Sequence, residues 1–155
     1  MKTLLKIILI ATSTFSAGKG LSQTTFPTVW TPGMHLKMYT KAMSPGNPTV
    51  IHIGTESFFE SYLTGEEKKT KLNISQKDLN EILVKFNQYD LAGIQSTASN
   101  MTVHDGSTTF LIFKNDEKEF SLVTGSMYEI KDPTQKKNKE AIYAYLNALV
   151  DRANK

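Results

Sequence analysis

Three residues of the types that catalyse hydrolysis lie within four positions in the stretch TVHDGSTTF, residues 102–110. His104, Asp105 and Ser107 match the base, the acid and the nucleophile of a Ser-His-Asp site. Such a site needs the base to bridge the other two groups in space, and neighbouring side chains in a turn diverge. Asp-Gly is itself a strong turn signal, because glycine accepts a positive φ. We therefore interpret the stretch as a turn. The alternative is a small hydrolase or ligand-binding protein with a cleft near His104.

The other two histidines, His35 and His52, fall in segments that alternate like paired strands. Pairing Met38 with Ile53 places the two histidines four residues apart along the sheet, or about 13 Å. Zinc ligands lie about 2 Å from the ion, so histidines at that separation cannot share one. The chain has no cysteine, which removes thiolate ligands and cysteine nucleophiles. The sequence therefore predicts no metal site.

Two carboxylate pairs, Glu66-Glu67 and Asp116-Glu117, fall in predicted turns among lysines, where solvated charge explains them. The chain contains no phosphate-binding glycine loop and no G-x-S-x-G motif. We therefore predict no catalytic residue, no cofactor-binding residue and no cofactor. The expectation is a protein that is not an enzyme.

The N-terminus, MKTLLKIILIATSTFSAGKGLSQ, has the layout of a secretory signal peptide over residues 1–22. Lys2 and Lys6 precede a short apolar run that fades into small residues, too short for a membrane span of about 20 residues. We expect cleavage between Ser22 and Gln23, with a cut after Gly18 as the alternative. With no cysteine, a lipid anchor on an N-terminal cysteine is excluded. The expected location is periplasmic or extracellular.

Export changes the charge balance of the chain. Of its 18 basic residues, three lysines lie before the expected cut, and their removal leaves 15 basic against 15 acidic residues. A neutral chain with a single arginine, Arg152, is a poor candidate for binding nucleic acid, which requires a basic face. About 130 residues can bury a sufficient core without disulfides, so one disulfide-free domain is expected.

The periodicity predicts the element order β-β-β-β-α-β-β-α. After an extended lead-in at 23–33, strands are expected in the segments MHLKMYTKAM, PTVIHIGT, SFFESYL and KKTKLNI. A capping-box pattern at Ser75 and Asp78 begins a helix, and Asp132 with Pro133 begins the last one. Between the helices, TTFLIFK and KEFSLVT form a hairpin. The predicted fold is a single α+β domain over 34–155, an antiparallel sheet with two helices on one face.

Aromatic residues are the strongest indication of function. Alternation places Phe58 and Tyr62 on the same face of one strand, with Tyr39 nearby. Phe26 and Trp30, in the lead-in, either cover this face or leave an exposed aromatic patch that marks an interface. We favour covering, with Trp30 packed on the domain itself or on a bound partner. The candidate partner contacts are thus Phe26, Trp30, Tyr39, Phe58 and Tyr62.

The stretches VIHIGTESFFESYLTG, ISQKDLNEILVKFNQYDL and DGSTTFLIFKNDEKEFSLV, followed by a C-terminal helix, resemble small secreted domains of unknown function. Their layout is similar to emfourin-type inhibitors of thermolysin-like metalloproteases over roughly residues 34–150. The resemblance implies a compact domain that binds protein, and it assigns no inhibitory residue. We therefore expect an exported protein-binding domain, either an inhibitor or an accessory subunit of an envelope complex.

Overall fold

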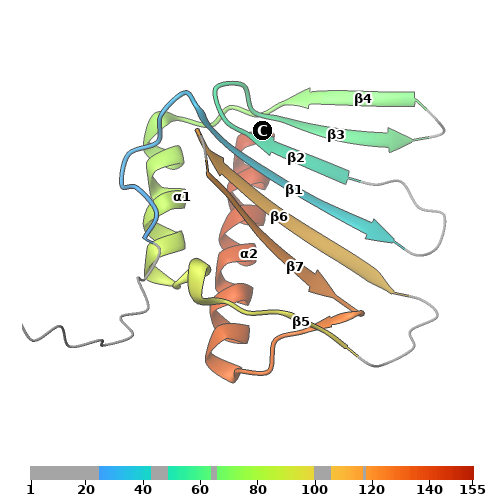
Figure 1. Ribbon diagram of the computed structural model, residues 1–155. Coiled ribbons are helices and arrows are strands. Elements are labelled where there is room, and N and C mark those ends of the chain that lie inside the picture. Colours follow the sequence, from blue (N-terminus) through green and yellow to red (C-terminus); the bar gives the residue numbers. More distant parts are fainter. Residues whose placement is uncertain (1–24, 43–48, 64–65, 100–105, 117) are drawn as a thin grey trace, which may run out of the picture.

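The computed structural model describes residues 25–42, 49–63, 66–99, 106–116 and 118–155 (Figure 1). Within them lies one antiparallel sheet of eight strands, in the order β4-β3-β2-β1-β6-β7-β8-β5, with two α-helices. The predicted α+β fold is confirmed. The elements are β1 Met34–Ala42, β2 Thr49–Ile53, β3 Phe58–Leu63, β4 Glu66–Lys71, α1 Gln76–Gln88, the 3-10 helix η1 Leu91–Gly93, β5 Thr97–Ala98, β6 Ser107–Asn115, β7 Lys118–Gly125, β8 Tyr128–Glu129 and α2 Pro133–Ala153.

Both helices begin at the residues that the sequence indicates. Ser75 and Asp78 form the reciprocal capping box at the start of α1. Asp132 accepts hydrogen bonds from the backbone N–H groups of Thr134 and Gln135 at the start of α2, where Pro133 occupies the first turn. No helix in the described part of the chain is long and apolar enough to cross a membrane.

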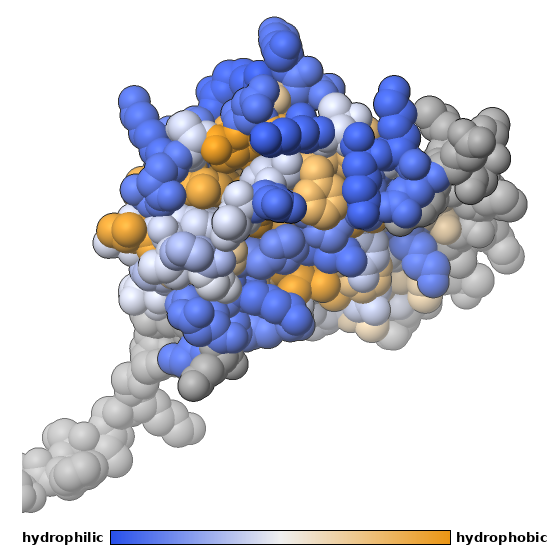
Figure 2. All heavy atoms as spheres, turned by 90° about the horizontal axis from the view of Figure 1, so that it is seen from above, coloured by the Kyte–Doolittle hydropathy of each residue, from blue (hydrophilic) through white to orange (hydrophobic). Residues whose placement is uncertain are grey.

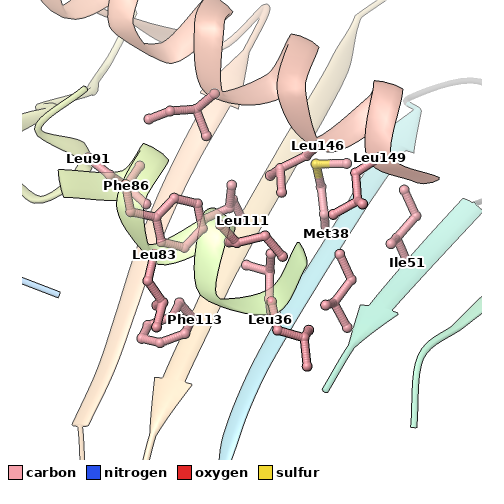
Figure 3. Close-up of a cluster of buried hydrophobic side chains, with 14 of the residues drawn as sticks. Leu36, Met38, Ile51, Leu83, Phe86, Leu91, Leu111, Phe113, Leu146 and Leu149 are labelled. Carbon is pink, nitrogen blue, oxygen red and sulfur yellow. The ribbon is translucent and has the colours of Figure 1, made fainter. Parts of the chain in front are cut away.

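The two helices pack on one face of the sheet, and Figure 1 shows β6 and β7 passing in front of α2. Met34, Leu36 and Met38 of β1 are buried on the helix side, because every second side chain of a strand points to the same face. They pack with apolar residues of both helices (Figure 3). The intervening residues of β1 point to the opposite face, which we call the open face.

The pairing of β1 with β2 differs from the predicted register by two residues. Met38 lies opposite Ile51, and Leu36 lies opposite Ile53. Either register keeps the apolar residues on one face, because the side chains of a strand repeat every two positions. Hydrophobic alternation alone therefore cannot choose between them.

The lead-in does not cover the open face, and that part of the prediction is wrong. Phe26 and Trp30 are 8% and 4% exposed and belong to the core on the helix side. The Phe26 ring lies 5.2 Å from Phe86, 5.5 Å from Phe113 and 5.6 Å from Phe120, each pair edge to face. Trp30 therefore packs on the domain itself, and the core begins at Phe26 rather than at residue 34.

Amide side chains of α1 hold the lead-in in place. Asn87 accepts from the Phe26 N–H at 2.8 Å and donates to the Phe26 carbonyl at 2.9 Å. One turn after the start of the helix, Asn80 accepts from the Trp30 N–H at 2.8 Å, and Gln76 donates to the Trp30 carbonyl at 2.9 Å. These bonds satisfy backbone groups that an extended segment otherwise leaves without partners.

Tyr145 makes the stability of the fold sensitive to alkaline pH. Burial, followed by the nearby carboxylates Glu81 and Asp78, raises the pKa of Tyr145 to about 12. In the unfolded chain the phenol ionises near pH 10, so between about pH 10 and about pH 12 only the unfolded state loses the proton. Rising pH in this window therefore favours unfolding. The hydroxyl makes no hydrogen bond within the described residues, so removing it leaves no partner unsatisfied.

We therefore expect Tyr145→Phe to retain more stability than the wild type when the pH rises from about 9 to about 11.5, as measured by urea unfolding. At neutral pH the two proteins should be equally stable within about 0.5 kcal/mol. Tyr128→Phe removes an exposed hydroxyl from β8 and is the matched control, which should lose stability as the wild type does. Identical alkaline losses in Tyr145→Phe and the wild type would contradict the assignment.

Candidate functional site

The open face combines apolar and charged side chains from neighbouring strands of the sheet. The helices and the lead-in lie on the other side, so its apolar residues are half-buried rather than buried. Cross-strand pairing places together on this face His35, Lys37 and Tyr39 of β1, Val50 and His52 of β2, Phe58 and Glu60 of β3, Lys69 of β4, and Phe110, Ile112 and Lys114 of β6. A surface of this mixed character is typical of a binding site.

Two ring stacks form the apolar part of the open face. Tyr39 lies on Phe110 with ring centroids 4.7 Å apart and planes at 9°. His52 lies on Phe58 with centroids 4.5 Å apart and planes at 17°. The Nζ of Lys37 lies 5.4 Å from the centroid of Tyr39, which holds a cation beside the first stack.

The second stack belongs to a chain of polar contacts across four strands, β1 to β4. His35 Nε2 lies 3.3 Å from His52 Nδ1, and His52 Nε2 lies 3.5 Å from a carboxylate oxygen of Glu60. Lys69 completes the chain, with its Nζ 3.5 Å from Glu60 and 3.0 Å from Glu67. The predicted separation of about 13 Å between the histidines is wrong, because the two-residue shift in register makes them neighbours.

Burial keeps both histidines in the neutral form. Desolvation, followed by the adjacent His52, lowers the pKa of His35 below its usual 6.5. Desolvation also lowers the pKa of His52, although Glu60 acts in the opposite direction. Both rings are therefore uncharged at neutral pH and present one nitrogen each as an acceptor.

The structure separates the five candidate partner contacts. Tyr39 and Phe58 lie on the open face, as the alternation predicts. Tyr62 lies in β3 opposite Glu67, and its side chain is outside the described part of the structure. Phe26 and Trp30 are buried in the core and therefore do not reach a partner in this structure.

Sequence reasoning missed two members of the open face. Phe110 and Ile112 alternate with the buried Leu111 and Phe113, so the period of two in TTFLIFK was sufficient to place them. The cluster around His35 and His52 was missed for a different reason, because it depends on the register and not on the alternation.

The predicted turns have mixed outcomes. His104 and Asp105 lie outside the described residues, so the turn at Asp105-Gly106 stays a prediction. Ser107 is exposed at the start of β6, the strand that was expected to follow the turn. Asp116 does lie at the turn between β6 and β7, with φ 45°. The prediction of a turn at Glu66-Glu67 is wrong, because both residues lie at the start of β4. There Lys69 forms an ion pair with Glu67.

Apart from the open face, the structure has a cleft on the helix side of the sheet, between α2 and residues of β1, β2, β6 and β7. This cleft has a volume of about 620 Å³, and its lining includes Thr40, Thr109, Thr124 and Tyr143. The Tyr143 hydroxyl lies 3.5 Å from the Thr124 hydroxyl, and burial raises the pKa of Tyr143. Its size is that of a small-molecule site, and its lining includes the charged residues Lys139 and Glu140 of α2.

No family model matches this chain, and no curated protein matches it. The similarity to emfourin-type inhibitors therefore stays a prediction.

Proposed function

We propose that the chain is an exported, non-enzymatic protein-binding domain that contacts its partner through the open face. One observation carries the proposal: the Tyr39–Phe110 and His52–Phe58 stacks lie side by side on a sheet face that no described helix covers. Aromatic side chains are enriched in protein interfaces, and tyrosine is among the residues that contribute most to the binding energy. An inhibitor and an accessory subunit of an envelope complex are both functions of this kind.

The charge of the open face indicates the chemistry of the partner. Lys37, Lys41 and Lys71 lie on it, and none of them forms an ion pair with a described residue. By contrast, Glu60 and Glu119 on the same face are neutralised by Lys69 and Lys114. The proposed partner therefore presents apolar side chains to the stacks and carboxylates to the lysines.

The edge of the sheet is less suited to binding than its face. The surface seen from above in Figure 2, on the side of β4, is mostly hydrophilic. β4 carries Lys68, Lys69 and Lys71, and lysines on an edge strand oppose the addition of another strand. The proposed partner consequently packs on side chains rather than extending the sheet.

To test the proposal, the protein is purified from its native host without a tag. The purified protein is then used to capture partners from an extract of the same host, and mass spectrometry quantifies them. Its intact mass should lack residues 1–22, as export requires. Tyr39→Ser combined with Phe110→Ser should reduce capture of a specific protein at least about tenfold, since both residues are central aromatic contacts. Val84→Ser removes an exposed apolar residue from α1 and is the matched control, which should capture normally.

Equal capture by the double variant, the control and the wild type would refute the open face as the binding surface. Recovery of a full-length cytoplasmic chain would refute export. Thermal unfolding of each variant separates lost contacts from lost folding, because the two substituted rings are only half-buried.

The cleft beside α2 supports the second candidate, a ligand-binding protein or small hydrolase, although His104 lies outside the described residues and is not among those that line it. Ala144 is exposed and lines the cleft, so Ala144→Trp fills it without changing the open face. Loss of a bound small molecule or of hydrolytic activity in this variant, with capture unchanged in the open-face variant, would favour the second candidate.

A further inference from the structure

The geometry of His35 and His52 points to a binding site for a divalent transition-metal ion, and we propose that these two residues bind zinc or a similar ion. The ring nitrogens that face each other, His35 Nε2 and His52 Nδ1, are 3.3 Å apart. Two nitrogens each about 2.0–2.1 Å from a tetrahedral zinc ion lie about 3.3 Å from each other. The metal-free protein thus already holds the two nitrogens at the separation that such an ion requires.

A carboxylate lies beside the second nitrogen of His52, as it does in many metal-bound histidines. Its second nitrogen, Nε2, faces Glu60 at 3.5 Å, so the nitrogen nearest His35 is the one available to a metal. A carboxylate on the far nitrogen of a ligating histidine fixes the tautomer and makes the ligand more basic. Lys69 in turn lies 3.5 Å from the other oxygen of Glu60 and restrains that carboxylate.

Packing holds both rings in place before any metal binds. His52 is stacked on Phe58, and its side chain is 14% exposed. The His35 ring lies close to Gly54, and a Cβ atom at position 54 would be only 3.2 Å from His35 Nδ1. Both histidines project from central strands of the sheet, and ligands on such rigid elements need little reorganisation to bind.

The proposed site is open rather than closed. Among the described residues, no group of three or more histidine or carboxylate side chains is placed to hold one ion. The described residues therefore supply two ligands, and we propose that water or a side chain of a bound partner supplies the others. Lys37, directly opposite His52 and two residues from His35, opposes the charge of the ion and limits the affinity.

The simpler interpretation is a hydrogen bond between two histidines, without any metal. The two interpretations differ in how neighbouring charges act. In a metal site Glu60 strengthens binding of the ion and Lys37 weakens it, so their removal must change the affinity in opposite directions. A hydrogen-bonded pair that binds no ion predicts neither change.

The test titrates Zn²⁺ into the tag-free protein by calorimetry, and Co²⁺ as an optical probe of coordination geometry. We expect one ion per chain. Glu60→Gln should weaken binding about 10–100-fold, and His35→Gln and His52→Gln should weaken it further. Lys37→Gln should tighten binding by about two- to tenfold, since it removes a nearby positive charge. His104→Gln, at the third histidine of the chain, is the control and should bind as the wild type does.

A measurement on the wild-type protein tests the site even if the variants do not fold. Addition of Zn²⁺ should shift the imidazole NMR signals of His35 and His52 and leave those of His104 in place. Absence of these shifts, or equal affinity in the wild type and both His35→Gln and His52→Gln, would overturn the site. Weaker binding by Lys37→Gln would overturn it as well.

Discussion

Phe26→Ala is expected to lower the free energy of unfolding by about 3–5 kcal/mol, the usual cost of removing a buried aromatic ring. The ring is 8% exposed and meets Phe86 of α1, Phe113 of β6 and Phe120 of β7 edge to face. Its loss opens a cavity at the point where the helix meets the sheet. The surrounding rings come from three different elements, so they cannot readily close the gap.

Chemical unfolding of the two proteins measures the effect. Val29→Ala is the matched control, because Val29 lies in the same segment but is 58% exposed. It should change the stability by less than about 0.5 kcal/mol. Trp30 provides an independent signal, since its 4% exposure predicts blue-shifted fluorescence that is protected from quenchers. Equal stability of Phe26→Ala and Val29→Ala would show that the lead-in does not belong to the core.

The aromatic residues of the lead-in predicted that Trp30 packs on the domain or on a partner, but not the face of the sheet on which the lead-in lies or the residues that hold it. A segment rich in threonine and proline, without charge or periodicity, is typical of a linker. Its attachment depends on Asn80 and Asn87, which are seven residues apart and therefore lie on the same side of α1. Asparagine on a helix surface is unremarkable in a sequence. The two residues become informative only when the backbone that they contact is known.

The fold itself was largely predictable, because each indication was local. The alternation of Leu36 and Met38 with Lys37 fixes which face of β1 is buried, and the Ser75 and Asp132 caps fix where the helices begin. The strands β5 and β8 have two residues each and were not predicted, since two residues carry no periodicity.

The candidate site was predictable only in part. Its face follows from alternation, which correctly placed Tyr39 and Phe58. Its chemistry depends on which residues are opposite one another, and a shift of two positions keeps every face while changing every neighbour. In the predicted register the two histidines are isolated from each other. In the observed register His35 and His52 are in contact at 3.3 Å. The contact between the two histidines was therefore missed because the register between β1 and β2 could not be predicted from the sequence.

Gly125→Ala is expected to lower the free energy of unfolding by at least about 2 kcal/mol, because two costs add at this position. Gly125, at the end of β7, has φ 139°, a conformation that residues with a side chain rarely adopt. In addition, a Cβ at this position would overlap the backbone carbonyl oxygen of Ser107. That carbonyl accepts a hydrogen bond from the Ser126 N–H at 3.0 Å, so the backbone cannot move away without losing it.

The substitution should also disturb the cleft beside α2, since Gly125 lines it together with Thr124 and Tyr143. Urea unfolding gives the change in stability, and Ser121→Ala, at an exposed position of the same strand, is the control that should remain within about 0.5 kcal/mol of the wild type. A stability of Gly125→Ala equal to that of Ser121→Ala would mean that β7 and the start of β6 do not approach as closely as described. The strain would reach β6 and β8 as well as β7, because Gly125 pairs with both Thr108 of β6 and Tyr128 of β8.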